Sequence, residues 1–94
     1  MQVVRERCCG LDVHKRTVVA CVLITASDGA AQREVRTFGT MTAGLLALSD
    51  WVDECSVTHI ALESTGVYWR PVLNLLEDDS RTLVLVNPQH IAVI

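Results

Sequence analysis

The chain has 94 residues, half of them apolar, and a formal net charge of −3. This length allows one domain at most, or part of one, with a core of modest size. The acidic balance argues against a free-standing nucleic-acid binder, because such proteins contact phosphates with surplus Lys and Arg. Any role on nucleic acid must therefore depend on a local site or on further parts.

The cysteines and the N-terminus bear on the cellular compartment. No CxxC or Cys/His spacing typical of zinc is present, and adjacent cysteines on a strand point to opposite faces. We predict free, packed thiols in a cytoplasmic protein at Cys8, Cys9, Cys21 and Cys55. The charged start, Arg5-Glu6-Arg7, is not a signal peptide, and no uncharged apolar run reaches the ~18 residues of a membrane span. We therefore expect no membrane association.

The first half of the chain predicts a meander of three antiparallel strands. Residues 3–13 are small or apolar in their inner part, as in a central strand covered on both faces. Residues 17–25 are rich in β-branched side chains, which favour a second strand. Ser27-Asp28-Gly29 is typical of a hairpin, and the alternating residues 34–40 then predict an edge strand.

The second half alternates helices and strands. A helix is predicted from Thr42, with Thr40 or Thr42 as its cap, and its inner stripe consists of Leu45, Leu48, Val52 and Cys55. Residues 57–62 and 82–86 are apolar strands, and Asn87-Pro88 ends the second of them.

The helix between these two strands contains Pro71, which suits only a first helical turn. It therefore begins near Arg70, or begins at Thr65 and kinks. The resulting order, β-β-β-α-β-α-β, predicts an α/β fold with three antiparallel strands followed by parallel strands and right-handed helical crossovers.

Two carboxylates stand at the ends of predicted strands. Asp12 lies in an otherwise buried strand, and burying an ionised carboxylate is costly unless it is paired or bound to a metal. Alternatively, Asp12 caps a turn or pairs with Lys15 or Arg16. Glu63 precedes Ser64-Thr65-Gly66, which can also serve as a helix cap.

The pair of carboxylates is more informative than either member. If the strands of Asp12 and Glu63 are parallel neighbours, their carboxyl ends meet at the sheet edge where α/β proteins bind ligands. Mg²⁺ suits such a site, because it binds one or two carboxylates together with substrate phosphate oxygens and water. Two such ions can activate the attacking oxygen and stabilise the leaving oxygen of a phosphodiester.

Three stretches, in order and spacing, resemble one known family. They are Gly10-Leu11-Asp12-Val13-His14-Lys15, Glu63-Ser64-Thr65-Gly66-Val67-Tyr68-Trp69 and Val86-Asn87-Pro88. Together they resemble the N-terminal domain of the DEDD transposases of insertion sequences, which are related to the Piv-type DNA invertases. The resemblance implies a RuvC-like, RNase H-like mixed sheet, DNA as substrate, and a guide RNA encoded by the element.

The resemblance also implies site residues and a cofactor. The first Asp of the family's acidic tetrad matches Asp12 and its Glu matches Glu63, with Mg²⁺ or Mn²⁺, two ions in the complete enzyme, as cofactor. The last two acids of the family follow the Asn-Pro segment, and this chain stops at Ile94. We therefore expect residues 1–94 to form a partial catalytic domain that lacks the remainder and a second C-terminal domain, and that is inactive alone.

Several residues near these motifs allow two interpretations. Lys15 and Arg70 can contact phosphate or remain solvated, and Tyr68 can stack on a base or pack on the core. Ser64, Thr65 and Gly66 can cap a helix or support Glu63. His14 has no His or Cys partner at a zinc spacing.

Two other functions remain possible from the sequence. The same element order opens the actin-like ATPases and sugar kinases, although the turn His14-Lys15-Arg16-Thr17 lacks the glycines of their phosphate loop. A non-catalytic assembly module is the other alternative. We also expect a homo-oligomer, because an incomplete sheet with an apolar parallel edge pairs readily with another chain.

Overall fold

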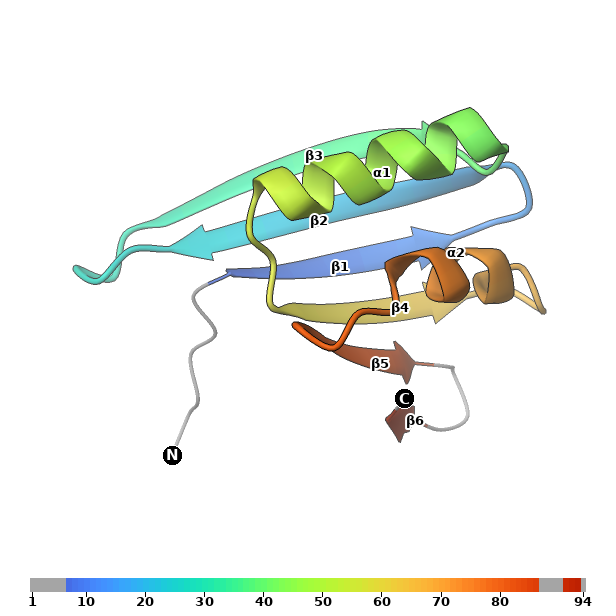
Figure 1. Cartoon of the computed structure of the whole chain (residues 1–94). Coiled ribbons are helices and arrows are strands. Elements are labelled where there is room, and N and C mark those ends of the chain that lie inside the picture. The colour runs from blue at the N-terminus through green and yellow to red at the C-terminus, as the bar shows by residue number, and fades with distance from the viewer. Residues whose placement is uncertain (1–6, 87–90, 94) are drawn as a thin grey trace.

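The chain forms one mixed sheet with two helices (Figure 1). A computed structural model describes residues 7–86 and 91–93. The elements are β1 (Arg7–Val13), β2 (Thr17–Thr25), β3 (Ala31–Gly39), α1 (Thr42–Glu54), β4 (His59–Ser64), α2 (Trp69–Leu76), β5 (Thr82–Val86) and β6 (Ile91–Val93). The predicted order is confirmed, and β6 is added to it. The predicted strand residues 3–6 and the stop at Asn87-Pro88 lie outside the described residues.

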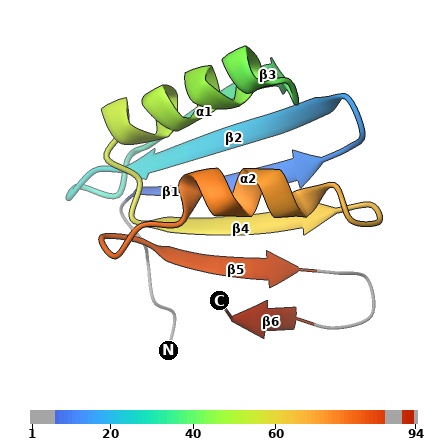
Figure 2. The ribbon, with the colours of Figure 1, turned by 45° about the vertical axis from the view of Figure 1, so that its right-hand side comes forward.

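The sheet has the order β3-β2-β1-β4-β5-β6 (Figure 2). β1, β2 and β3 are antiparallel neighbours, whereas β1, β4 and β5 are parallel. This confirms three antiparallel strands followed by parallel ones. β6 pairs antiparallel with β5, so the apolar parallel edge expected at β5 is wrong. The reason is that the strand after β5 returns along it instead of leaving it exposed.

Local sequence explains the hairpin that joins β2 and β3. The Ala26 N–H donates to the Ala30 carbonyl at 2.7 Å, and Gly29 has a φ of +87°. This left-handed conformation favours glycine, as the Ser27-Asp28-Gly29 signal predicts. β3 begins at Ala31, three residues before the predicted strand.

The two helices begin close to their predicted positions, but one cap differs. α1 begins at Thr42 with Met41 as its N-cap, and no side chain caps it, so the predicted Thr40 or Thr42 cap is wrong. Thr40 Oγ1 instead donates to the Lys15 carbonyl at 2.8 Å. α2 begins at Trp69, which places Pro71 in the first turn and rules out the kinked helix from Thr65.

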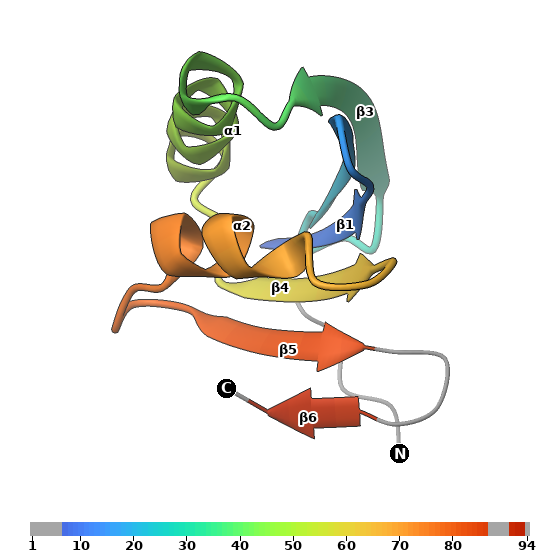
Figure 3. The same cartoon turned by 90° about the vertical axis from the view of Figure 1, so that its right-hand side faces the viewer.

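Both helices pack on the same face of the sheet (Figure 3). The predicted stripe of α1 is buried at Leu45, Leu48 and Val52, and Trp51, which the stripe did not include, is buried with them. Alternate residues of the central strands meet the helices, and the largest of the fully buried ones are Val13, Val18, Val22, Ile60 and Leu62.

The opposite face of the sheet has no helix among the described residues. β1 therefore buries only every second residue, on the face that meets the helices. The expectation of a strand covered on both faces is wrong for the described part of the chain. The residues on the open face are small or apolar for the most part: Gly10, Val19, Cys21, Leu23, Ala61, Val84 and Val86. The near-continuous apolar sequence of β1 therefore does not mean that both faces of the strand are covered.

The cysteines lie as free thiols on different faces. Cys9 is 3% exposed in the core, and burial raises the pKa of its thiol to about 12. Cys8, its neighbour in sequence, points to the open face, as strand alternation predicts. No helix in the described part of the chain is long and apolar enough to cross a membrane.

Arg81, just before β5, is a buried cation that the sequence did not draw attention to. Its side chain is 7% exposed, and its Nη2 lies 2.5 Å from Asp53 Oδ1 on α1. Its Nε and Nη1 have no partner among the described residues. An unsatisfied buried donor costs free energy, so this cation is held at a penalty.

We predict that Arg81→Met leaves the free energy of unfolding within about 1 kcal/mol of the parent, because a buried charge with unpaired donors can be replaced by an apolar chain of similar length. Asp53 keeps its hydration, since its side chain is 59% exposed. Arg81→Ala should instead lose about 2 kcal/mol through the cavity it leaves. Urea unfolding of both variants checks this, and an equal loss in both would show that the charge itself stabilises the fold.

Candidate functional site

The structure brings the two predicted carboxylates together on neighbouring strands. β1 and β4 are parallel, and their register places Asp12 directly opposite Glu63. Strand neighbours lie about 4.8 Å apart, so the two side chains leave the same face side by side. They stand near the carboxyl ends of both strands, at the edge that the sequence predicts. Glu63 lies inside β4, because this strand runs two residues past its predicted end.

The carboxylates border a hollow on the helix-free face. Its volume is about 300 Å³, and it is lined by Gly10, Leu11, Asp12, Val19, Cys21, Ala61, Glu63 and Val86. Gly10 and Ala61 are register partners, and no atom lies within 4 Å of a Cβ built on Gly10. Two small side chains in adjacent strands therefore leave an apolar floor beside the acidic pair.

Both carboxylates are exposed, which changes one argument made from the sequence. The Asp12 side chain is 55% exposed, so the free-energy cost of burying its charge, which the sequence led us to expect, does not arise. The reason is that the face carrying Asp12 is uncovered in the described part of the chain. Repulsion between two such exposed charges is about 1 kcal/mol in water, which the fold tolerates and a cation would relieve.

His14 contacts Asp12 directly. Its Nε2 lies 3.0 Å from Asp12 Oδ2, and its side chain is 45% exposed. Sequence reasoning did not assign this contact, although residues i and i+2 of an extended chain share a face. The spacing Asp12-Val13-His14 is therefore the signal that could have identified it.

The turn that carries His14 is held in place by its own backbone and by Thr40. The His14 N–H donates to the Thr17 carbonyl at 2.9 Å. Thr40 donates twice, from Oγ1 to the Lys15 carbonyl at 2.8 Å and from its N–H to the Arg16 carbonyl at 3.2 Å. The role of Thr40 is thus to fix the β1–β2 turn beside the acidic pair.

The remaining predicted residues lie around this edge, and most are exposed. Lys15 is exposed in the β1–β2 turn. Ser64 Oγ donates to the Thr65 carbonyl, and the Thr65 N–H donates to the Val13 carbonyl, so this segment ties β4 to β1. Because α2 begins at Trp69, Ser64 and Thr65 do not cap it. Gly66 has a φ of +59°, which the turn out of β4 requires.

The start of α2 presents two of the predicted contact residues. Tyr68 is 40% exposed, so the expectation that it packs on the core is not met. The Arg70 guanidinium lies 5.0 Å from the centre of the Trp69 ring, a cation–π distance. Trp69 itself is half-buried against the core, so it is the aromatic residue that packs there.

The donor set of the acidic pair fits a divalent cation that prefers oxygen. Asp12 and Glu63 offer carboxylate oxygens alone, which Mg²⁺ and Mn²⁺ accept together with water and phosphate oxygens. No group of three or more His, Cys, Asp or Glu side chains suited to a metal occurs among the described residues. The pair by itself would therefore fill only part of the coordination shell of such a cation.

A family model decides between the possibilities that the sequence left open. The model of the DEDD transposases of the IS110 type, described as a transposase, matches residues 9–94. The chain belongs to the DEDD transposase family. This membership favours the transposase interpretation over the actin-like ATPases. No curated protein matches the chain significantly.

Solved structures with low sequence identity share the fold of this transposase-family chain. A fowlpox virus resolvase, determined in complex with substrate Holliday junction DNA, superposes with a TM-score of 0.63 at 8% identity, and the match covers 89% of this chain and 62% of the resolvase chain. The type II Ppx/GppA phosphatase of Aquifex aeolicus gives 0.53 at 14%, covering 89% and 36%. An exopolyphosphatase of Cytophaga hutchinsonii gives 0.51 at 11%, covering 88% and 35%. These matches confirm the RuvC-like, RNase H-like fold.

Acidic residues elsewhere in this transposase-family chain do not extend the site. Asp78 and Asp79 lie between α2 and β5, next to the amino end of β5 and hence at the opposite end of the parallel strands from Glu63. The backbone N–H of Ser80 donates to Asp78 Oδ1, and this hydrogen bond lowers the pKa of the Asp78 carboxyl. Asp78 therefore stabilises the turn before β5.

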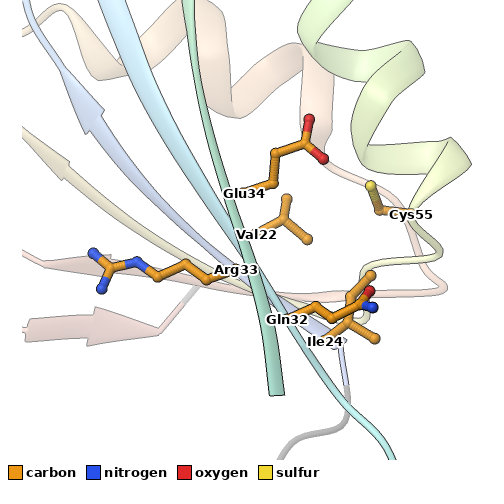
Figure 4. Close-up of a pocket in the computed structure, with 6 residues that line it drawn as sticks. All are labelled: Val22, Ile24, Gln32, Arg33, Glu34 and Cys55. Carbon is orange, nitrogen blue, oxygen red and sulfur yellow. The ribbon is translucent and has the colours of Figure 1, made fainter. Parts of the chain in front are cut away.

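A larger hollow lies away from the carboxylate pair. It has a volume of about 360 Å³ between the β2–β3 hairpin and the end of α1, and Figure 4 shows its lining residues Val22, Ile24, Gln32, Arg33, Glu34 and Cys55. Arg33 points away from the others in this view. Glu34 is paired with Arg36 at 2.5 Å, and desolvation raises the pKa of the Cys55 thiol. This hollow thus lacks both free carboxylates and a reactive thiolate.

Proposed function

We propose that Asp12 and Glu63 are catalytic residues of a transposase that cleaves and transfers DNA strands during the transposition of an insertion sequence. The observation that carries this proposal is their register pairing on adjacent parallel strands, in a chain of the DEDD transposase family. The two carboxylates are the positions that match the first half of the family's acidic tetrad. They are also the acidic side chains that border the hollow on the open face.

The proposed cofactor is Mg²⁺ or Mn²⁺, with two ions in the complete enzyme. Bound there, such ions stabilise negative charge on the oxygens of a phosphodiester and favour a nucleophilic hydroxide or hydroxyl. The role of Asp12 and Glu63 is to hold that positive charge at the end of β1 and β4. A pair of carboxylates fills only part of an octahedral coordination shell. We therefore infer that further acidic residues, corresponding to the last two of the family's tetrad, complete the site.

The proposed DNA contacts surround the acidic pair. Lys15 in the β1–β2 turn and Arg70 at the start of α2 supply positive charge at this edge, and exposed Tyr68 supplies an aromatic face for an unpaired base. Ser64, Thr65 and Gly66 support Glu63 by fixing the turn that follows it. Because the net charge of the chain is −3, we propose that DNA affinity depends on these few groups and on further protein segments that supply positive charge.

Other proposed properties follow from the same interpretation. We propose a cytoplasmic enzyme that works as a homo-oligomer, with a guide RNA of the element as a further partner. The exposed apolar face of the sheet and the free edge at β3 are surfaces on which chains could associate. Residues 1–94 are expected to be inactive without the further acidic residues.

Metal titration tests the proposed site directly. Adding Mn²⁺ to the ¹⁵N-labelled chain should broaden the amide signals near Asp12 and Glu63 first, because paramagnetic broadening falls steeply with distance from the ion. Amides around Asp28, an exposed carboxylate in the distant hairpin, provide the internal control. EDTA should restore the lost signals. Equal broadening at both places, or none near Asp12, would contradict the proposal.

A further inference from the structure

His14 is the one side chain within ion-pair distance of Asp12 among the described residues. The separation of 3.0 Å joins Nε2 of the imidazole to Oδ2 of the carboxylate. Nε2 carries a proton in the imidazolium and in one of the two neutral tautomers, and in both forms it attracts the oxygen. The contact involves one oxygen of Asp12 and leaves Oδ1 outside it.

The turn that carries the imidazole is held in place by hydrogen bonds to its backbone. His14 donates its N–H to Thr17, and the following two carbonyls, of Lys15 and Arg16, both accept from Thr40. Thr40 comes from the segment between β3 and α1, so the turn is fixed from two directions. The backbone from which the His14 side chain extends is therefore held beside the Asp12 carboxylate.

An unrestrained aspartate on an open sheet face would sample several rotamers. Among the described residues, the side chain within ion-pair distance of Asp12 is that of His14, while Glu63, the register partner of Asp12, repels it. Ordering a carboxylate before the ligand arrives removes part of the entropy lost on binding. Groups that orient the ligands of a metal affect its affinity by this route.

We propose that His14 is a positioning residue that orients the Asp12 carboxylate for the divalent cation. It does so by engaging Oδ2, so that Oδ1 faces the cation side of the pair. This inference deepens the proposed function and rests on it. It assigns to His14 a task that does not require the imidazole to bind the cation itself.

The test compares Mn²⁺ affinity in four forms of the full chain by electron paramagnetic resonance of free Mn²⁺. His14→Ala should weaken binding on the order of ten-fold. His14→Gln should restore most of the affinity, because its amide nitrogen lies the same number of bonds from Cα as Nε2. His59→Ala is the matched control, since His59 lies at the other end of the shared β1–β4 register, where it pairs with Cys8. The unfolding midpoint of each form is measured alongside.

A metal-free measurement gives an independent reading. In ¹⁵N spectra the neutral His14 ring should be in the Nε2–H tautomer, and Asp12→Ala should shift it toward the Nδ1–H form. His59 should be unaffected by that substitution. This measurement tests the contact between His14 and Asp12 directly and does not require an enzymatic assay.

The outcomes separate this inference from the proposed function. Tight Mn²⁺ binding by the parent with unchanged affinity in His14→Ala would overturn the positioning role alone. Imidazole nitrogen coupling to bound Mn²⁺ would also overturn it, because His14 would then be a ligand. Loss of affinity in His14→Ala that Gln does not restore, with a lowered unfolding midpoint, would reveal a merely structural role. Absence of Mn²⁺ binding in the parent would overturn the cation site and this inference together.

Discussion

Under the proposed function, replacing Asp12 by Asn in a complete transposase is expected to lower DNA strand cleavage by about 10³-fold. A bound divalent cation contributes several kcal/mol to stabilising a phosphodiester transition state, and about 4 kcal/mol corresponds to this factor. Asn keeps the shape of Asp12 and an oxygen within reach of His14, but it removes the negative charge that attracts the cation. The fold should therefore survive while the reaction fails. An excision assay in cells and a cleavage assay on element-end DNA both measure the effect.

The control for this experiment is a second acidic residue on an exposed surface. Asp50 lies on the outer face of α1, and Asp50→Asn makes the same chemical change away from the open face of the sheet. Its cleavage rate should match the parent. Glu63→Gln should reproduce the defect of Asp12→Asn, because the pair acts at one place. Full cleavage by either Asp12→Asn or Glu63→Gln would exclude that residue from the catalytic site.

Leu48→Ala is expected to remove a large share of the stability of the domain. Leu48 is fully buried on the inner face of α1, and deleting such a side chain costs about 2–5 kcal/mol through lost burial and the cavity that remains. The free energy of unfolding of a small domain is about 5–15 kcal/mol in total, so this loss is a large share. Denaturant unfolding followed by circular dichroism should show a midpoint shifted strongly downward.

Leu46→Ala provides the matched comparison on the same helix. Leu46 is 50% exposed, so the identical substitution removes little buried area and leaves no cavity. Its free energy of unfolding should change by no more than about 0.5 kcal/mol, as for most surface substitutions. If the two variants unfolded at the same denaturant concentration, the packing of α1 on the sheet described above would be wrong.

Much of the fold could be predicted because each element leaves a local trace in the sequence. The hairpin at Ser27-Asp28-Gly29, the stripe of α1 and the first-turn position of Pro71 each follow from a short-range rule. The pairing of Asp12 with Glu63 was predicted only on the condition that their strands are parallel neighbours, and the register of β1 and β4 meets that condition. The family resemblance of the motifs around Asp12 and Glu63 is confirmed by the match over residues 9–94.

Other features depend on contacts between segments far apart in the chain. Thr40 was expected to cap α1, yet it ties down the β1–β2 turn, 25 residues away from it at Lys15. A threonine hydroxyl can do either, and only the arrangement of β3 beside β2 decides between them. The same holds for β6, whose three residues are too few to show a strand period.

The sequence by itself determined the order of the elements as far as β5, the positions of two carboxylates at the ends of strands, and the resemblance to the transposase family. These follow from periodicity and from motifs that are read along the chain. Only the tertiary structure decided that Asp12 is exposed, that His14 contacts its carboxylate, and that a hollow floored by Gly10 and Ala61 lies beside the pair. The physical reason is that an apolar strand has the same sequence whether one face or both are covered. Exposure is therefore decided by where the helices pack.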